Sequence, residues 1–175
     1  MLRLETPRAI LITGPFGAGK SSLAGEIGDL VEGTIPFAAI DLDWLAWFDA
    51  MDGSPEHDVG AVELKNLSDV VRNYLDAGVL FFVLARSVPT AREADLLKSV
   101  LPMPVTVIRL EVPLAELEAR LGEDINTGRQ DDLRRAREWF AEGQGIGFED
   151  LVIENVRPLH EVAVEVIERV SSAWA

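Results

Sequence analysis

Near its start the chain carries an apolar segment that runs directly into a glycine-rich turn, Ala9-Ile-Leu-Ile-Thr-Gly-Pro-Phe-Gly-Ala-Gly-Lys-Ser21. The last eight residues fit the pattern G-x-x-x-x-G-K-[ST] at every position. The five residues before the turn are typical of a buried strand. Apolar residues at helical spacing follow it, at Leu23, Ile27, Leu30 and Val31. Strand, turn and helix together form the context in which this pattern binds phosphates, so we predict a phosphate-binding loop, or P-loop.

The expected chemistry of this loop divides between backbone and side chains. Glycines allow a tight turn that directs backbone N–H groups at phosphates, and the following helix adds the positive end of its dipole. We expect Lys20 to reach the outer phosphates and act in catalysis, and Ser21 to bind Mg²⁺. The predicted nucleotide contacts in this segment are Gly14, Pro15, Phe16, Gly17, Ala18, Gly19, Lys20, Ser21 and Ser22.

Short apolar runs alternate with helical patterns along the rest of the chain. The predicted strands are residues 9–13, 37–40, 79–85, 105–110 and 151–153, and the helical patterns cover 61–77, 90–100, 114–121, 131–142 and 158–171. This alternation predicts an α/β fold with a mainly parallel five-stranded sheet and helices on both faces. Together with the G-x-x-x-x-G-K-[ST] motif, it predicts the three-layer P-loop NTPase fold. We expect residues 1–175 to form a single domain.

Composition narrows the range of partners. The 175 residues carry a formal net charge of −14, and both nucleic-acid and anionic-membrane surfaces require clustered Lys and Arg. The chain has no cysteine, which excludes disulfides and thiolate metal sites. No apolar run approaches the ~20 residues of a membrane span. We therefore expect a cytoplasmic protein with no nucleic-acid or membrane partner.

Two acids follow the second predicted strand, in Ala38-Ala-Ile-Asp41-Leu-Asp43. Side chains alternate faces along a strand, so these carboxylates can point the same way. One can then organise Mg²⁺ while the other deprotonates an acceptor hydroxyl. We assign Asp41 to the metal and Asp43 to the acceptor, although the roles can be reversed. The competing interpretation is that Asp43 only caps a helix beginning at Trp44.

Other classes of P-loop protein fit less well. The sequence has no D-x-x-G after the loop and no N-K-x-D, which GTPases need. The strongest apolar strand, 79–85, ends in Arg86 rather than in the acid expected of an ATPase motor.

The order of these features resembles small-molecule kinases related to nucleoside monophosphate kinases, a group that includes shikimate, gluconate and adenylylsulfate kinases. The segment Asn66-Leu-Ser-Asp-Val-Val-Arg-Asn-Tyr-Leu-Asp-Ala-Gly78 is similar to the corresponding segment of adenylylsulfate kinases. Those enzymes typically carry D-G-D-N followed by Arg, whereas this chain has Asp41-Leu-Asp43-Trp44. Shikimate kinases carry a glycine triplet where this chain has Arg86-Ser-Val-Pro. The resemblance therefore indicates the class but no particular acceptor.

The resemblance implies a short lid, approximately residues 122–142, that closes over ATP and brings arginines to the transferred phosphoryl group. Four of the thirteen arginines fall within 129–137, and Arg134 and Arg137 share a helix face. The alternative is a solvated face paired with acids. The resemblance also implies that Arg120, Asn155 and Arg157 surround the adenine, although all three can be ordinary polar surface residues.

The acceptor pocket is the least defined part of the prediction. Arg86 suits an anionic group, or else an ion pair with one of the many acids, and Asn66 lies where it can contact the acceptor. Trp44, Trp47 and Phe48 favour core packing or a subunit contact over an acceptor wall. We expect an ATP- and Mg²⁺-dependent phosphotransferase acting on a small hydroxyl-bearing or anionic acceptor, as monomer or homodimer. The alternatives are a nucleotide-binding regulatory module and an NTP hydrolase.

Overall fold

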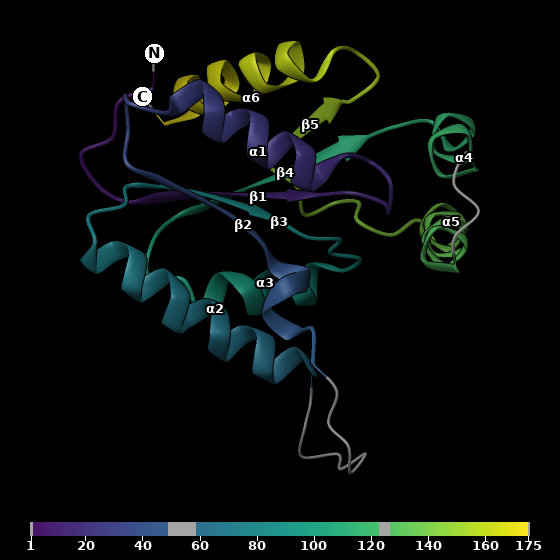
Figure 1. Cartoon of the computed structure of the whole chain (residues 1–175), viewed down its shortest axis with the longest axis horizontal. Helices are drawn as coiled ribbons and strands as arrows, with labels where there is room; N and C mark the ends of the chain where they lie inside the picture. The colour runs from purple at the N-terminus through teal and green to yellow at the C-terminus, as the bar shows by residue number, and fades with distance from the viewer. Residues whose placement is uncertain (1, 49–58, 123–126, 175) are drawn as a thin grey trace.

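The computed structural model describes residues 2–48, 59–122 and 127–174 of the chain. Five parallel strands form its sheet in the order β2-β3-β1-β4-β5. The strands are β1 (Arg8–Thr13), β2 (Phe37–Asp41), β3 (Phe81–Ala85), β4 (Val105–Glu111) and β5 (Leu151–Glu154). Their carboxyl ends share one edge of the sheet, which is where ligands bind in open parallel sheets (Figure 1).

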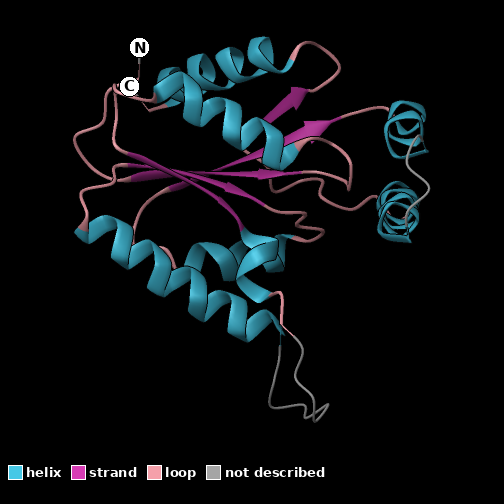
Figure 2. Cartoon of the chain, viewed as in Figure 1, coloured by secondary structure: helices cyan, strands magenta, loops and turns pink. Residues whose placement is uncertain are grey.

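Helices cover both faces and the carboxyl edge of the sheet (Figure 2). They are α1 (Lys20–Val31), α2 (Val59–Asp76), α3 (Ala91–Ser99), α4 (Leu114–Gly122), α5 (Thr127–Ala141), α6 (Leu159–Ala173) and the short 3₁₀ helix η1 (Leu42–Ala46). One face carries α1 and α6, and the other carries α2, α3 and η1, whereas α4 and α5 stand beyond the strand ends (Figure 1). The predicted three-layer α/β architecture is confirmed.

The sheet is apolar on both faces because a helix layer packs on each. In β1, Ile10 and Ile12 belong to the cluster under α1 and α6, while Leu11 belongs to the cluster under α2 and α3. All five residues of β3 are buried, as a strand covered on both sides requires. This rigid sheet fixes the position of every loop at its carboxyl edge.

Three local expectations differ from the structure. The strand predicted from residue 79 begins at Phe81, because Gly78 has φ 89° and Val79 bonds back to Tyr74. Helix α5 begins at Thr127 instead of 131. The helix expected from Trp44 is only a 3₁₀ turn.

The aromatic residues of this turn are exposed, so their assignment to the core is wrong. The exposed fractions are 66% for Trp44, 75% for Trp47 and 40% for Phe48. A single 3₁₀ turn has no continuous face to bury against the sheet, and the aromatic side chains of η1 and its exit are left beside Asp43. Among the described residues, no helix combines the length and hydropathy that a membrane crossing requires.

Candidate active site

The P-loop joins β1 to α1 at the carboxyl edge of the sheet. Gly17 and Gly19 have φ values of 79° and 87°, in the left-handed region that side chains disfavour. A Cβ at Gly17 would lie 2.9 Å from the side chain of Leu121, and one at Gly19 would lie 2.8 Å from the amide nitrogen of Asn155. These two positions therefore require glycine both for the turn and for close packing.

Lys20 begins α1 and folds back over its own loop. Its Nζ donates a hydrogen bond of 2.9 Å to the Pro15 carbonyl and lies 5.3 Å from the ring centroid of Phe16. Burial lowers the pKa of Lys20 to about 8, and the charges of Asp43, Asp41 and Asp132 only partly oppose that shift. The ammonium group is thus partly desolvated and poised for an anion such as a phosphate.

Ser21 and Asp41, the two residues predicted to bind Mg²⁺, are in direct contact. The Ser21 hydroxyl donates to Asp41 Oδ2 over 2.6 Å, and Asp41 Oδ1 accepts from the Asp43 backbone N–H over 3.1 Å. Asp41 therefore caps η1, and the interpretation that Asp43 serves only as a cap is wrong. Hydroxyl and carboxylate oxygens are the ligands that Mg²⁺ prefers, so this pair fits the ion.

Asp43 lies among cations at the first turn of η1. Burial raises its pKa, and the neighbouring charge of Asp41 adds to the shift. Lys20, Arg86 and Arg135 oppose it by stabilising the carboxylate. The sequence-predicted acid is thus brought together with the P-loop lysine, with the arginine after β3 and with one arginine of α5.

Arg86 follows β3 and forms an ion pair with Glu63 of α2. Glu63 is 3% exposed, and burial raises its pKa while the Arg86 charge lowers it. Two side-chain contacts hold the adjoining segment against the P-loop. The Ser87 hydroxyl donates to the Gly14 carbonyl over 2.9 Å, and the Val88 N–H donates to Thr13 Oγ1 over 2.9 Å.

Asn66, which we predicted to contact an acceptor, uses its side-chain amide within the protein. Its side-chain amide donates to the Leu45 carbonyl over 2.6 Å and so fastens η1 to α2. The amide that we expected to contact an acceptor is thereby engaged with the turn that carries Asp43.

The arginines of α5 divide into two groups. Arg134 bonds Glu138 over 2.6 Å, and Arg137 bonds Glu118 of α4 over 2.8 Å, so both predicted lid arginines are paired with acids. Arg135 instead stacks over Phe16 of the P-loop, with its Cζ 5.1 Å from the ring centroid.

Arg135 is a site candidate that we did not predict from the sequence. The buried side chains of α5 include Ala136 and Trp139, whereas Phe140 is 41% exposed. A helix face centred on Ala136 and Trp139 turns Asp132 and Arg135 toward the P-loop. The large apolar surface of the tryptophan is the sequence signal that could have indicated this face.

Asn155 ties three elements together. It is 4% exposed, and its side-chain amide donates to the Ala18 carbonyl of the P-loop over 2.7 Å. Its backbone N–H donates to the Glu111 carbonyl over 2.9 Å, and its own carbonyl accepts from Arg120 over 2.9 Å. The predicted proximity of Arg120 and Asn155 is therefore observed, but the Asn155 amide supports the loop from below.

Arg157 is separate from this group. It pairs with Glu165 of α6. The structure thus brings together two of the three residues expected around an adenine.

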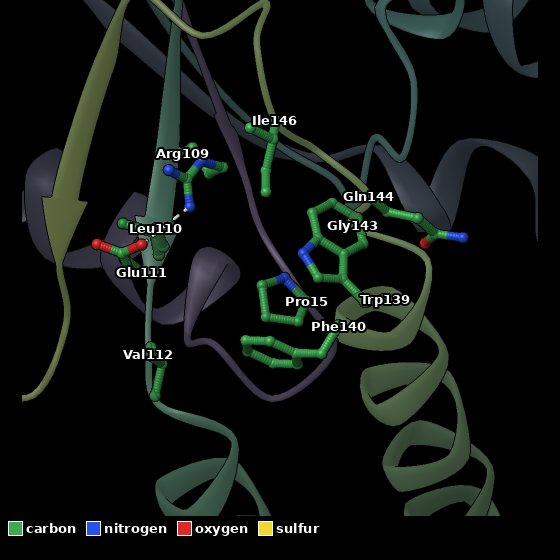
Figure 3. A pocket seen from close by; sticks show the side chains of 10 residues that line it. All are labelled: Pro15, Arg109, Leu110, Glu111, Val112, Trp139, Phe140, Gly143, Gln144 and Ile146. Atoms are coloured by element: carbon green, nitrogen blue, oxygen red, sulfur yellow. Dashed lines mark hydrogen bonds and ion pairs between the residues drawn. The ribbon is translucent and has the colours of Figure 1, made fainter.

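A cavity of about 220 Å³, which we call the Trp139 cavity, is lined by residues of the P-loop, of the end of β4, and of α5 and the segment after it (Figure 3). The rings of Pro15, Trp139 and Phe140 gather on one side of it, opposite the last residues of β4. Arg109 of β4 lines it and is held by Glu149 over 2.9 Å and by Glu111 over 3.4 Å. Of the residues predicted from sequence to form the site, only Pro15 lines this cavity.

Comparison with solved structures identifies the fold. A sugar kinase from Janibacter sp. HTCC2649 is 18% identical, with a TM-score of 0.65 and coverage of 94% of each chain. A tunicamycin resistance protein from Deinococcus radiodurans is 20% identical, with a TM-score of 0.63 and coverage of 95% of this chain and 96% of that one. The APS kinase CysC of Mycobacterium tuberculosis, solved with AMPPNP and APS, is 20% identical, with a TM-score of 0.60 and coverage of 94% and 98%.

No protein-family model matches the sequence, and the search of curated proteins found no match. The chain therefore has the fold of P-loop small-molecule kinases, with little sequence in common with the structures compared.

Proposed function

We propose that the protein is an ATP-dependent phosphotransferase that moves the γ-phosphoryl group of ATP to a hydroxyl of a small molecule. The observation that carries this proposal is the environment of Asp43. The carboxylate of Asp41 accepts from the Ser21 hydroxyl over 2.6 Å and from the Asp43 backbone N–H over 3.1 Å, which holds Asp43 beside the P-loop. The charges of Lys20 and of Arg135 in α5 act on the Asp43 carboxylate, whose pKa is raised by burial. A pure binding module has no need of a base beside its phosphate loop, whereas phosphoryl transfer to a hydroxyl uses one.

Each residue of the site has a role in the proposed reaction. Asp43 accepts the proton of the acceptor hydroxyl while that oxygen attacks the γ-phosphorus. The bond from the γ-phosphorus to its bridging oxygen breaks, and ADP leaves. Lys20 and Arg135 lie where positive charge stabilises the phosphoryl oxygens during transfer. The backbone N–H groups of the P-loop hold the remaining phosphates.

Ser21 and Asp41 would hold Mg²⁺. Their oxygens are already in contact, and oxygen donors of this kind suit the ion. When bound, Mg²⁺ neutralises phosphate charge. The described residues contain no group of three or more acidic or histidine side chains that could hold a metal, so phosphate oxygens are expected to supply further ligands.

The lid belongs to the same proposal. Residues 122–142 would close over the nucleotide, although 123–126 fall outside the described residues. Support for this role comes from α5, whose Arg135 already faces the P-loop while Arg134 and Arg137 are paired with Glu138 and Glu118. In this proposal Arg120 would flank the base. The proposed enzyme is a single-domain cytoplasmic protein that acts as a monomer or a homodimer.

Measurement of ADP release with Mg²⁺ and ATP tests the function. We expect ADP to form only when a hydroxyl compound from a broad panel is present, and Asp43→Asn to lower that rate by about 10²- to 10⁴-fold. Nucleotide binding by Asp43→Asn, followed as a shift in melting temperature, should remain. Turnover that is independent of acceptor would favour an NTP hydrolase, and binding without any turnover would favour a regulatory module.

A further inference from the structure

A second cavity, which we call the Arg86 cavity, lies between α2 and α3 and has a volume of about 390 Å³. Its walls include Ala61 and Leu64 of α2 and Leu96 and Leu97 of α3. Arg86 and Glu93 line it as charged residues. A mainly apolar cavity of this size with a few polar groups is typical of a small-molecule site.

The Arg86 cavity lies on the acceptor side of the proposed reaction. Asp43 follows β2, and the Arg86 charge acts on its carboxylate. The Asp43 charge in turn acts on Glu63, the partner of Arg86. The Trp139 cavity is lined by β4, which is three positions from β2 in the sheet order. A molecule in the Arg86 cavity is therefore better placed to present a hydroxyl to Asp43.

The charges of this cavity do not favour an anion. Arg86 is the only cation among the described residues that line it, and it is already paired with the buried carboxylate of Glu63. An anionic acceptor would have to draw Arg86 away and leave Glu63 buried without a partner, which is strongly unfavourable. Glu93 adds a second carboxylate at the wall, and Asp43 adds a third beside it.

Exposed aromatic side chains also lie on η1 and at its exit. Trp44 and Trp47 are exposed, and their ring centroids are 4.7 Å apart. Asp43 precedes this pair directly, and Asn66 fastens the turn to α2. Exposed tryptophans beside a proposed base are expected to contact the apolar part of a bound molecule.

We infer that the acceptor is a hydroxyl compound that carries no negative charge, either neutral or cationic, with a substantial apolar portion. The inference rests on the proposed function and narrows it. The Arg86–Glu63 pair excludes carboxylate, sulfate and phosphate acceptors, because Arg86 has no charge to spare for them. The apolar walls of the cavity instead suit the apolar portion of an acceptor. The hydroxyl proton goes to Asp43, and the oxygen takes the phosphoryl group.

The test compares hydroxyl compounds in matched pairs that differ only in a carboxylate against its amide, ester or amine counterpart. Suitable pairs are gluconate with gluconamide, shikimate with its methyl ester, and 4-hydroxyphenylacetate with tyramine. We expect the non-anionic member to have the higher kcat/KM for ADP release by about tenfold or more. A preference for the anionic member would overturn the inference and leave the proposed function standing. No turnover with any member, while ATP still raises the melting temperature, would overturn both.

A variant tests the physical cause. Glu63→Gln frees Arg86, so the preference should fall by about tenfold or reverse toward the carboxylate members. The double variant Glu63→Gln with Arg86→Gln has no free guanidinium and should keep the wild-type preference. The same selectivity in Glu63→Gln as in wild type would exclude the ion pair as its source. Comparison of the pairs in wild-type protein needs no variant, so misfolding of either one does not block the test.

Discussion

The guanidinium carbon of Arg135 lies 5.1 Å from the ring centroid of Phe16, and the ammonium nitrogen of Lys20 lies 5.3 Å from the same centroid. One aromatic side chain within the P-loop therefore holds two cations from different elements. Cation–π contacts of this kind are worth about 0.5–2 kcal/mol, which is weak compared with a phosphate ion pair. Phe16 thus keeps both charges beside the loop without competing with nucleotide phosphates.

Arg135 is predicted to be the arginine of α5 that acts in transfer. Arg135→Gln should lower kcat by roughly 100-fold or more, because a charge that stabilises the transferred group is lost. The measurement is steady-state ADP release at saturating ATP with an acceptor that supports turnover.

Arg134→Gln and Arg137→Gln are the matched controls on the same helix. Both side chains are exposed and paired with acids, so we expect each variant to remain within about threefold of wild type. A loss in Arg134→Gln or Arg137→Gln equal to that in Arg135→Gln would contradict the assignment.

Nucleotide binding is predicted to take up a proton at Lys20. At pH 8 about half of the ligand-free protein lacks this proton, since burial lowers the pKa to about 8, and phosphate binding restores it. Uptake should therefore rise from about half a proton at pH 8 toward one at pH 9. Calorimetric titration with ADP in buffers of different ionisation enthalpy measures this number.

Lys20→Arg separates this effect from other groups. Arginine stays protonated throughout the range, so uptake should vanish even if weaker binding remains. Equal uptake in Lys20→Arg and wild type would assign the proton to another residue.

The pH dependence of turnover should report the ionisation of the Asp43 carboxyl group. Because the base must be ionised and its pKa is raised, kcat/KM should fall on acidification at a higher pH than an ordinary aspartate would give. Arg86→Gln removes a charge that lowers this pKa, so the acidic limb should move to still higher pH. An unmoved limb would show that another group controls it.

One glycine of the P-loop and one of α1 form a matched pair of substitution sites, whose effects on the free energy of unfolding can be compared. Gly19→Ala introduces a side chain at φ 87° and against the Asn155 amide, so we expect a loss of about 1–3 kcal/mol and at least tenfold weaker ADP binding. Gly25→Ala, in α1, places its new Cβ more than 4 Å from any atom outside the neighbouring backbone of its own helix, so it should instead gain up to about 1 kcal/mol. Urea unfolding with and without ADP measures both changes, and equal effects would refute the strain argument.

The amide of Asn155 is predicted to support the P-loop rather than to bind the base. Asn155→Ala leaves the buried Ala18 carbonyl without its donor, which should cost about 1–3 kcal/mol of unfolding free energy. Affinities for ADP and GDP should fall by the same factor, because a support below the loop acts on phosphates alone. Selective loss of one base would place Asn155 in the base pocket.

The sequence predicted the parallel sheet and the glycine-rich loop because both depend on local patterns. It assigned Ser21 and Asp41 to the same metal ion but predicted no contact between them, because that contact joins two separate elements. A continuous apolar run identifies a strand that is buried on both faces. The spaced glycines indicate a tight turn, because glycine readily adopts the positive φ values that such a turn requires. The carboxyl edge follows from parallel topology, which places Asp41 and Arg86 near the loop without any knowledge of side chains.

The pairing of charged side chains was not predictable from local patterns. Glu63 belongs to a helix far from Arg86 in the sequence, and nothing in its neighbours distinguishes it from the exposed acids of the same chain. We predicted Arg134 and Arg137 instead of Arg135 as the arginines of the site. One helix position corresponds to about 100° of rotation, and this rotation decides which arginine faces the loop. Ion pairs over long separations and helix rotation depend on the packed structure.

Two hydrogen bonds join the P-loop segment to the segment after β3: Ser87 bonds Gly14, and Val88 bonds Thr13. These bonds make the phosphate loop and the segment that carries Arg86 one rigid unit. Helices α2 and α3, which form the walls of the Arg86 cavity, lie outside this unit on one face of the sheet. Substitutions at Leu64 or Leu96 are therefore expected to reshape the proposed acceptor cavity without touching the phosphate loop. The molecule offers a natural point for directed evolution, in which libraries confined to these two helices explore new acceptors while the nucleotide chemistry stays constant.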